Sequence, residues 1–101
     1  MSPYRNKKLL AASNGRPCVR CHKNDGTTVR AHYTGVRQHQ YGKGLGQKGH
    51  DFISADLCGS CHAHFDQYQG ANTSTKIDLS EEFLHLCMLS LARDFEEGII
   101  K

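Results

Sequence analysis

The sequence LCGSCHAHFD, residues 57–66, holds the densest group of metal-binding side chains in the chain and decides the expected fold. These ten residues contain two thiols, Cys58 and Cys61, together with two imidazoles and one carboxylate. Two cysteines separated by two residues can place both sulfur atoms on one tetrahedral metal ion. The segment therefore predicts half of a zinc site, with two histidines and an aspartate beside it for other chemistry.

A second pair with the same spacing, Cys18 and Cys21, lies upstream, separated from the first by the 36 residues 22–57. Together the two pairs supply the four thiolates of a structural zinc site, an interpretation favoured over disulfides or an iron–sulfur cluster. The gap is longer than in a simple zinc ribbon, so we expect a strand pair with a loop to fill it. The fifth cysteine, Cys87, lies within an apolar helical pattern and is expected to be a small buried hydrophobe.

The length of 101 residues fits a single small domain. A domain of this size buries only a modest core, so a metal ion would add stability that the core lacks. The first fourteen residues contain no continuous apolar stretch like that of a secretory signal peptide. No apolar run approaches the roughly 18 residues that span a bilayer. We therefore expect a soluble protein of a reducing compartment, the cytoplasm, with no membrane partner.

Charge is divided unevenly along the chain. Residues 1–50 contain ten lysines and arginines and one acid, a formal charge of +9, whereas residues 51–101 contain three basic and nine acidic residues, a charge of −6. A basic field of this kind suits a polyanion, and nucleic acid is the commonest one. A solvated basic surface is the alternative. The basic residues expected to contact nucleic acid are Arg30, Arg37, Lys43 and Lys48.

Local patterns divide the single domain into a basic arm over residues 1–17, a core over 18–68 and a last helix over 77–98. In the arm, two leucines and two alanines precede Asn14-Gly15, which favours one or two helical turns ended by the glycine. Residues 70–75 have the composition of a linker. The core should contain strands over 27–33 and 51–57, a long glycine-rich loop over 34–50 and a helix over 58–68.

The last helix has the strongest helical pattern in the chain. Asp78 and Glu81 resemble an N-terminal capping box, and apolar residues recur at helical spacing from Phe83 to Phe95, ahead of Gly98. Its apolar stripe, residues 84, 88, 91 and 95, is expected to pack over the metal-bound core.

Several short motifs occur in an order that points to a family. They are Gly15-Arg16-x-Cys18, Ala31-His32, Asp51, Cys58-x-x-Cys61-His62, Asp66 and the tail Glu97-Gly98-Ile99-Ile100-Lys101. This order resembles the ββα-metal endonucleases (His-Me finger or HNH nucleases) that carry a four-cysteine zinc. Within that group the chain is similar to small prophage nucleases related to YbcO and to the phage recombination-enhancing nuclease Ref.

The resemblance implies an α+β fold, a small zinc-stapled ββα-metal domain with a C-terminal helix. It also implies a metal-dependent endonuclease that hydrolyses DNA phosphodiester bonds in phage or prophage recombination or DNA processing. DNA would be the main partner, with a recombinase filament as a further candidate, in the cytoplasm of the bacterial host. The cofactors would be structural Zn²⁺ and catalytic Mg²⁺ or Mn²⁺.

The residue types suit this reaction, in which His32, Asp51 and His62 are the expected catalytic residues. Phosphodiester hydrolysis needs a base to deprotonate water and a divalent cation to stabilise charge on the phosphate and leaving-group oxygens. His32 would be the base, since an imidazole titrates near neutrality. His62 would hold Mg²⁺ or Mn²⁺ with Asp51 or Asp66, because a carboxylate beside an imidazole suits harder ions than thiolates do.

Two residues depart from the family pattern. Ala31 stands where many members carry aspartate or histidine, and Asp51 stands where asparagine is common; Asp51 can coordinate metal or orient His32.

Two other functions fit part of the pattern. A zinc-dependent nucleic-acid-binding module without catalysis would not need His32, Asp51 and His62 together. A protein-interaction zinc domain predicts an exposed apolar groove near the last helix.

Overall fold

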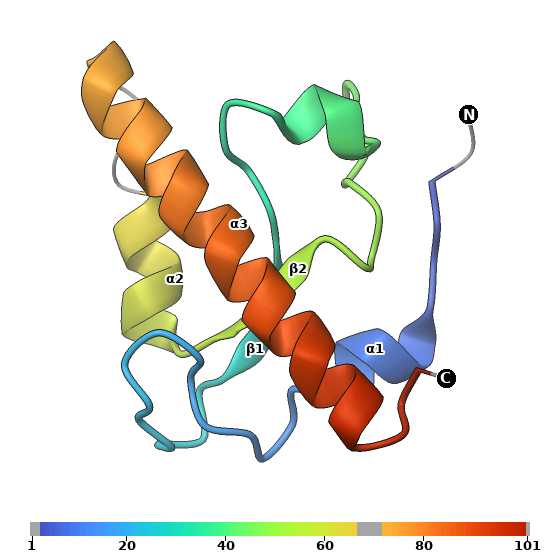
Figure 1. Cartoon of the computed structure of the whole chain (residues 1–101). Helices are drawn as coiled ribbons and strands as arrows, with labels where there is room; N and C mark the ends of the chain where they lie inside the picture. Colours follow the sequence, from blue (N-terminus) through green and yellow to red (C-terminus); the bar gives the residue numbers. More distant parts are fainter. Residues whose placement is uncertain (1–2, 67–71, 101) are drawn as a thin grey trace.

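The computed structural model describes residues 3–66 and 72–100. Its elements follow the order α1, β1, a short 3-10 helix η1, β2, α2 and α3 (Figure 1). They span Lys7–Ala11, Val29–His32, Gln38–Tyr41, Ser54–Leu57, Gly59–Asp66 and Thr73–Glu96. The predicted class, a small α+β fold with two strands, is confirmed. The predicted end of the second helix at residue 68 and the first part of the predicted linker, residues 70–71, lie outside the described residues.

The two strands form an antiparallel pair in which Val29 lies opposite Leu57 and His32 lies opposite Ser54. Every residue of β2 is buried, because α3 packs against it. The chain passes from β2 through Cys58 into α2, so two strands and a helix follow one another as expected. This register puts Cys58 and His32 at opposite ends of the strand pair. Cys58 and the candidate base His32 therefore lie apart on one sheet.

The face that α3 turns to the core differs from the predicted one. The buried residues are Ser80, Phe83, Leu86, Cys87, Ser90 and Asp94. Two members of the predicted stripe, Met88 and Phe95, are instead 58% and 54% exposed. The predicted start of the helix, residue 77, is also wrong, because α3 begins at Thr73. Asn72 is its N-cap, and the Asn72 side chain accepts a hydrogen bond from the Thr75 amide at 2.9 Å. Part of the predicted linker is thus the first helical turn.

A buried ionic cluster explains why a partly polar face of α3 points inward. Arg30 in β1 donates to the two carboxylate oxygens of Asp94 at 3.0 and 2.7 Å. Arg16 bridges Asp94 at 2.9 Å and Asp56 at 3.1 Å, and Arg93 lies 3.2 Å from Asp56. Removing Asp56 or Asp94 would leave the buried guanidinium groups of Arg16 and Arg30 with less negative charge to balance them, which is unfavourable. Arg30 therefore belongs to the core and not to the basic surface on which we predicted it.

The basic arm is folded onto the rest of the domain. α1 begins after Asn6, the side chain of which accepts hydrogen bonds from the Lys8 and Leu9 amides. Leu9 is completely buried and anchors this helix to the core. Gly15 has a φ of 83°, the left-handed conformation that favours glycine. The predicted helical turn is confirmed, although it ends at Ala11, ahead of the glycine.

The glycine-rich segment over residues 34–50 contains more structure than we predicted. It includes η1 and an isolated bridge between Gly44 and Gln47. Tyr41 at the end of η1 packs edge-on against the buried ring of Tyr33, with the ring centroids 5.9 Å apart. His50 is also buried and stacks on Phe52 at 5.1 Å. The basic residues of this segment therefore lie on a folded part of the chain.

Gly35 lies where this segment contacts α3, and its replacement by alanine should destabilise the protein. An added Cβ would lie against the Tyr33 hydroxyl and Ser80 Oγ, which are buried and bonded to each other. Overpacking of this kind costs about 1–3 kcal/mol of unfolding free energy. At Gly44 the nearest atom to an added Cβ is 3.8 Å away, so Gly44→Ala is a matched control. Urea unfolding of the two variants measures the difference in stability, and equal unfolding midpoints would contradict the prediction for Gly35.

Candidate functional site

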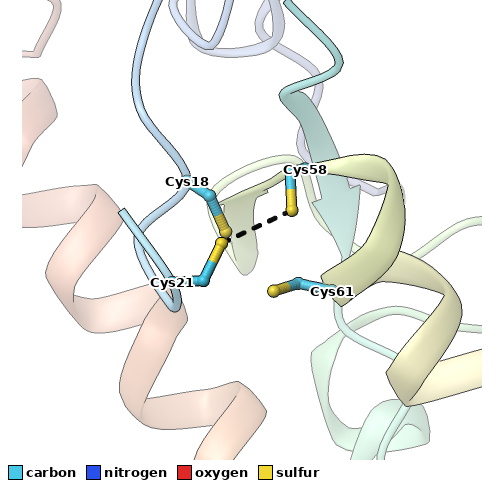
Figure 2. A group of neighbouring side chains, drawn as sticks. All are labelled: Cys18, Cys21, Cys58 and Cys61. Atoms are coloured by element: carbon cyan, nitrogen blue, oxygen red, sulfur yellow. Dashed lines mark hydrogen bonds between the residues drawn. The ribbon is translucent and has the colours of Figure 1, made fainter. Parts of the chain in front are cut away.

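The four cysteines of the two pairs meet at one end of the sheet. Cys18 and Cys21 lie in the loop before β1, Cys58 follows β2 and Cys61 lies in the first turn of α2. Their sulfur atoms lie within 4.8 Å of one another, and all four point toward a common centre (Figure 2). All are free thiols, and three are buried. The sequence prediction that the two pairs form one cluster is confirmed.

The geometry of this cluster fits a tetrahedral zinc ion. A Zn–S distance of about 2.3 Å requires neighbouring sulfurs to lie about 3.8 Å apart. The Cys21 and Cys58 sulfurs are 3.6 Å apart. Four thiolates are also the donor set of a closed structural site, with no position left for a substrate. Cys87 is buried in α3 and is not part of the cluster, as predicted.

The surroundings of the thiols shift the pKa values of two of them in opposite directions. Burial alone would raise the pKa of Cys18, but hydrogen bonds from nearby backbone amides lower it to about 6. Burial raises the pKa of Cys61 to about 12, against the lowering effect of a hydrogen bond from Arg20 at 3.5 Å. The thiols therefore do not all ionise together at neutral pH unless a metal ion offsets their charge.

A histidine–aspartate pair occupies the other end of the sheet. Nε2 of His32 lies 2.8 Å from Oδ1 of Asp51. The Asp51 side chain is 2% exposed, whereas 14% of the His32 side chain remains accessible. Burial alone would raise the pKa of Asp51, but hydrogen bonds from His32 and from the Asn6 amide hold it below its usual range. With Asp51 ionised, a neutral His32 donates through Nε2–H and keeps Nδ1 as its acceptor.

The N-terminal arm completes this pair. The amide of Asn6 donates to Oδ2 of Asp51 at 2.7 Å, and Arg5 Nη1 lies 3.1 Å from Oδ1. The Arg5 guanidinium also donates to the carbonyl of Lys48 at 2.9 Å. Both carboxylate oxygens of Asp51 are thus engaged by protein groups. No sequence motif predicts these contacts, because the arm lies more than forty residues from Asp51 and only the folded chain brings them together.

The remaining predicted site residues lie on α2. Nε2 of His62 is 3.7 Å from Oδ2 of Asp66, one turn further along the helix, and the two side chains are 41% and 58% exposed. Within residues 3–66 and 72–100, the four cysteines are the only group of three or more metal-type ligands that converge. His62 therefore does not join His32 and Asp51 in a single ligand cluster. His64 lies beside Arg20, with Nε2 3.3 Å from Nη2.

The predicted nucleic-acid contacts differ in accessibility. Arg37 and Lys48 are exposed and Lys43 is half-buried, all on the segment over residues 34–50. Arg30, in the ionic cluster, has a side chain that is only 1% exposed. Arg20 was not predicted, yet it links the four-cysteine cluster to α3, because it donates a hydrogen bond to Cys61 Sγ at 3.5 Å and pairs with Glu82 at 2.9 Å. Its place between two zinc-type cysteines is the one sequence feature that marks it.

No helix in the described part of the chain is both long and apolar enough to cross a membrane. Comparison of the chain with protein-family models, with curated proteins and with solved structures gave no match. Function must therefore be inferred from the thiol cluster, the His32–Asp51 pair and the distribution of charge.

Proposed function

We propose that the protein is a metal-dependent endonuclease that hydrolyses DNA phosphodiester bonds, with His32 as its general base. The observation that carries this proposal is the 2.8 Å contact between His32 Nε2 and Asp51 Oδ1. A carboxylate that holds one ring nitrogen fixes the tautomer and leaves the other nitrogen to accept a proton. The four-cysteine cluster, as a closed structural zinc site, would hold the sheet and α2 in place around the His32–Asp51 pair.

Asp51 is proposed to orient His32 and not to bind the catalytic metal. Its Oδ1 accepts from His32 and Arg5, and its Oδ2 accepts from the Asn6 amide. A metal ion would have to displace at least one of these groups. Of the two roles that the sequence left open for Asp51, orientation of the base requires no rearrangement.

His62 and Asp66 are the proposed ligands of the catalytic divalent ion. They supply one imidazole and one carboxylate from a single face of α2, and both are accessible. Mg²⁺ is commonly held by one or two protein ligands together with water and substrate phosphate. When bound, the ion would supply charge stabilisation to the phosphate and to the leaving oxygen.

In this mechanism different residues activate the water and bind the DNA. Nδ1 of His32 would accept the proton of the attacking water, and ionised Asp51 would stabilise the resulting imidazolium. Arg37, Lys43 and Lys48 would hold the phosphate backbone through charge, without reading bases.

A non-catalytic nucleic-acid-binding module is the second candidate function. The observation that favours it is that His62 does not converge with His32 and Asp51 within the described residues. In that case the His32–Asp51 pair would only fasten the N-terminal arm to the sheet. The two functions share the zinc and the basic half and differ in one respect, the cleavage of a bound strand.

Cleavage of end-labelled DNA by zinc-loaded protein tests the leading proposal. We expect products with added Mg²⁺ or Mn²⁺ and none when only the structural zinc is present, since the thiolate site has no open position. Single-stranded, duplex and branched DNA should be tested with an RNA of the same sequence. Binding without cleavage of any of these would favour the second candidate.

Binding should depend on the lysines of the 34–50 segment. Replacing Lys43 and Lys48 together by alanine should lower DNA affinity for all sequences alike, and should reduce the slope of log K against log[salt] by roughly 2. Lys76→Ala, an exposed lysine of the acidic half, is the control and should leave the slope unchanged. Fluorescence anisotropy over a salt series measures both. An affinity that does not vary with salt would mean that the basic face is only a solvated surface.

A further inference from the structure

One side of α3 carries an apolar stripe that the core covers only in part. It consists of Ile77, Leu84, Met88, Leu91 and Phe95, and we call it the α3 stripe. Ile77, Met88 and Phe95 are 51%, 58% and 54% exposed, while the two leucines are half-buried. α3 lies across the outside of the strand pair (Figure 1). Contiguous apolar surface of this kind marks interaction sites.

The spacing of the stripe is that of a helix that pairs with another helix. Positions 77, 81, 84, 88, 91 and 95 alternate in steps of four and three, like the a and d positions of a coiled coil. Glu81 is the one polar residue in the series. At 1.5 Å per residue the helix is about 36 Å long, which is enough for several interlocking layers.

The stripe is complementary to itself in an antiparallel arrangement. Ile77 and Phe95 lie nine residues on either side of position 86, and Leu84 and Met88 lie two residues on either side of it. A twofold axis beside position 86 would therefore set Ile77 against the second copy's Phe95 and Leu84 against its Met88. Glu81 of one copy would face Leu91 of the other at the edge of the interface. A parallel pairing in register would instead set Glu81 against Glu81, which is unfavourable.

A pocket beside the stripe adds a shape argument. Val36, Ile77 and Leu84 line it, with Ser80, Glu81 and Arg37 at its polar sides. Val36 is 53% exposed, so this apolar wall is open to solvent. In the antiparallel register Phe95 of a second copy comes to Ile77, at this pocket. Its acidic neighbour Glu96 and the negative end of its helix would lie near the positive charge of Arg37. The same face thus carries both the protruding ring and its receptor, as a twofold interface requires.

We infer that the α3 stripe is a homodimer interface, in which two copies of this chain pair antiparallel through α3 about a twofold axis beside position 86. The stripe lies on α3, whereas His32 and Asp51 lie on β1 and the loop before β2, so the inference does not depend on the proposed nuclease activity.

Sedimentation equilibrium of the zinc-loaded full chain tests the inference. We expect the wild type to be dimeric at about 100 μM, and Phe95→Asp to weaken the dimer by at least roughly 30-fold. Leu45→Asp is the matched control, because Leu45 is fully exposed but lies outside the stripe; it should remain dimeric. Circular dichroism and zinc content check that each variant is folded. A monomeric wild type at this concentration would overturn the inference.

A charge exchange tests the antiparallel register. Ile77→Lys alone and Phe95→Glu alone should each give monomers, because each introduces a charge into an apolar layer. The double variant should regain the dimer, since every Lys at position 77 would then face a Glu at position 95 of the second copy. A double variant that is as monomeric as the single ones would show that Ile77 and Phe95 do not meet, and would overturn the proposed pairing.

Discussion

Replacing Cys58 by alanine should unfold the domain and release its zinc. Four thiols converge within 4.8 Å, and Cys58 joins the end of β2 to the start of α2. Structural zinc sites contribute about 10–16 kcal/mol of apparent binding free energy at neutral pH. This matches or exceeds the total stability of a typical domain, about 5–15 kcal/mol. We therefore expect about one zinc per chain in the wild type, and a loss of cooperative thermal unfolding in the variant.

Cys87→Ala is the control that separates loss of a ligand from loss of a cysteine. Cys87 is equally buried but lies on α3, outside the cluster. Its replacement removes one small apolar group, so the variant should keep its zinc and lose only about 1 kcal/mol or slightly more of stability. Elemental analysis and calorimetry measure both quantities. A folded, soluble Cys58→Ala protein without metal would contradict a structural role for the cluster.

Replacing His32 by alanine should lower the cleavage rate by roughly 10²- to 10⁴-fold, the usual contribution of a positioned general base. Zinc content, fold and DNA affinity should remain nearly unchanged, because His32 is neither a cysteine-cluster ligand nor a backbone contact to DNA in our proposal. His85→Ala, an exposed histidine on α3, is the control and should cut at the wild-type rate. Single-turnover cleavage at saturating protein separates the rate from the affinity.

The metal role of His62 predicts a different kind of defect. His62→Ala should also abolish cleavage, but through weaker binding of Mg²⁺ or Mn²⁺. Higher metal concentration should therefore restore part of the activity of His62→Ala and none of that of His32→Ala. If metal rescues both variants or neither, the division of roles between the two histidines is wrong.

The sequence was sufficient to predict the thiol cluster because its determinants are local. Each Cys-x-x-Cys pair carries its ligand spacing within four residues, and two such pairs in one small domain are typical of a zinc site. The strands and the second helix were found for a similar reason, since their patterns are short and bounded by the cysteines. The contact between His32 and Asp51 joins residues that the family resemblance had already placed in one site.

The core face of α3 could not be read from its own sequence. Apolar periodicity selected the side that carries Met88 and Phe95, but Arg16 and Arg30 draw Asp94 into the core from distant parts of the chain. Such a cluster is visible only when all partners are placed. Met88 and Phe95, which we expected to face inward, are therefore exposed and form part of the surface proposed for a second copy of the chain.

The contacts of the N-terminal arm were missed for the same physical reason. Arg5 and Asn6 read as part of a basic terminal segment, and nothing nearby indicates that they close over Asp51. The sequence thus supplied a candidate base and its carboxylate. The folded chain adds the groups that bind both oxygens of this carboxylate. Of the two roles that the sequence left open for Asp51, these contacts favour orientation of His32 over binding of a metal ion.

The most direct test of the proposed function is a side-by-side measurement of strand cleavage by wild-type and His32→Ala proteins. Both should be zinc-loaded, shown to bind labelled DNA equally, and supplied with Mg²⁺ or Mn²⁺ on single-stranded, duplex and branched substrates. The proposal predicts that the wild type cuts at least one substrate and that His32→Ala binds it but cuts at least roughly 100-fold more slowly. A wild type that cuts none of them, or a His32→Ala protein that cuts as fast, would contradict it.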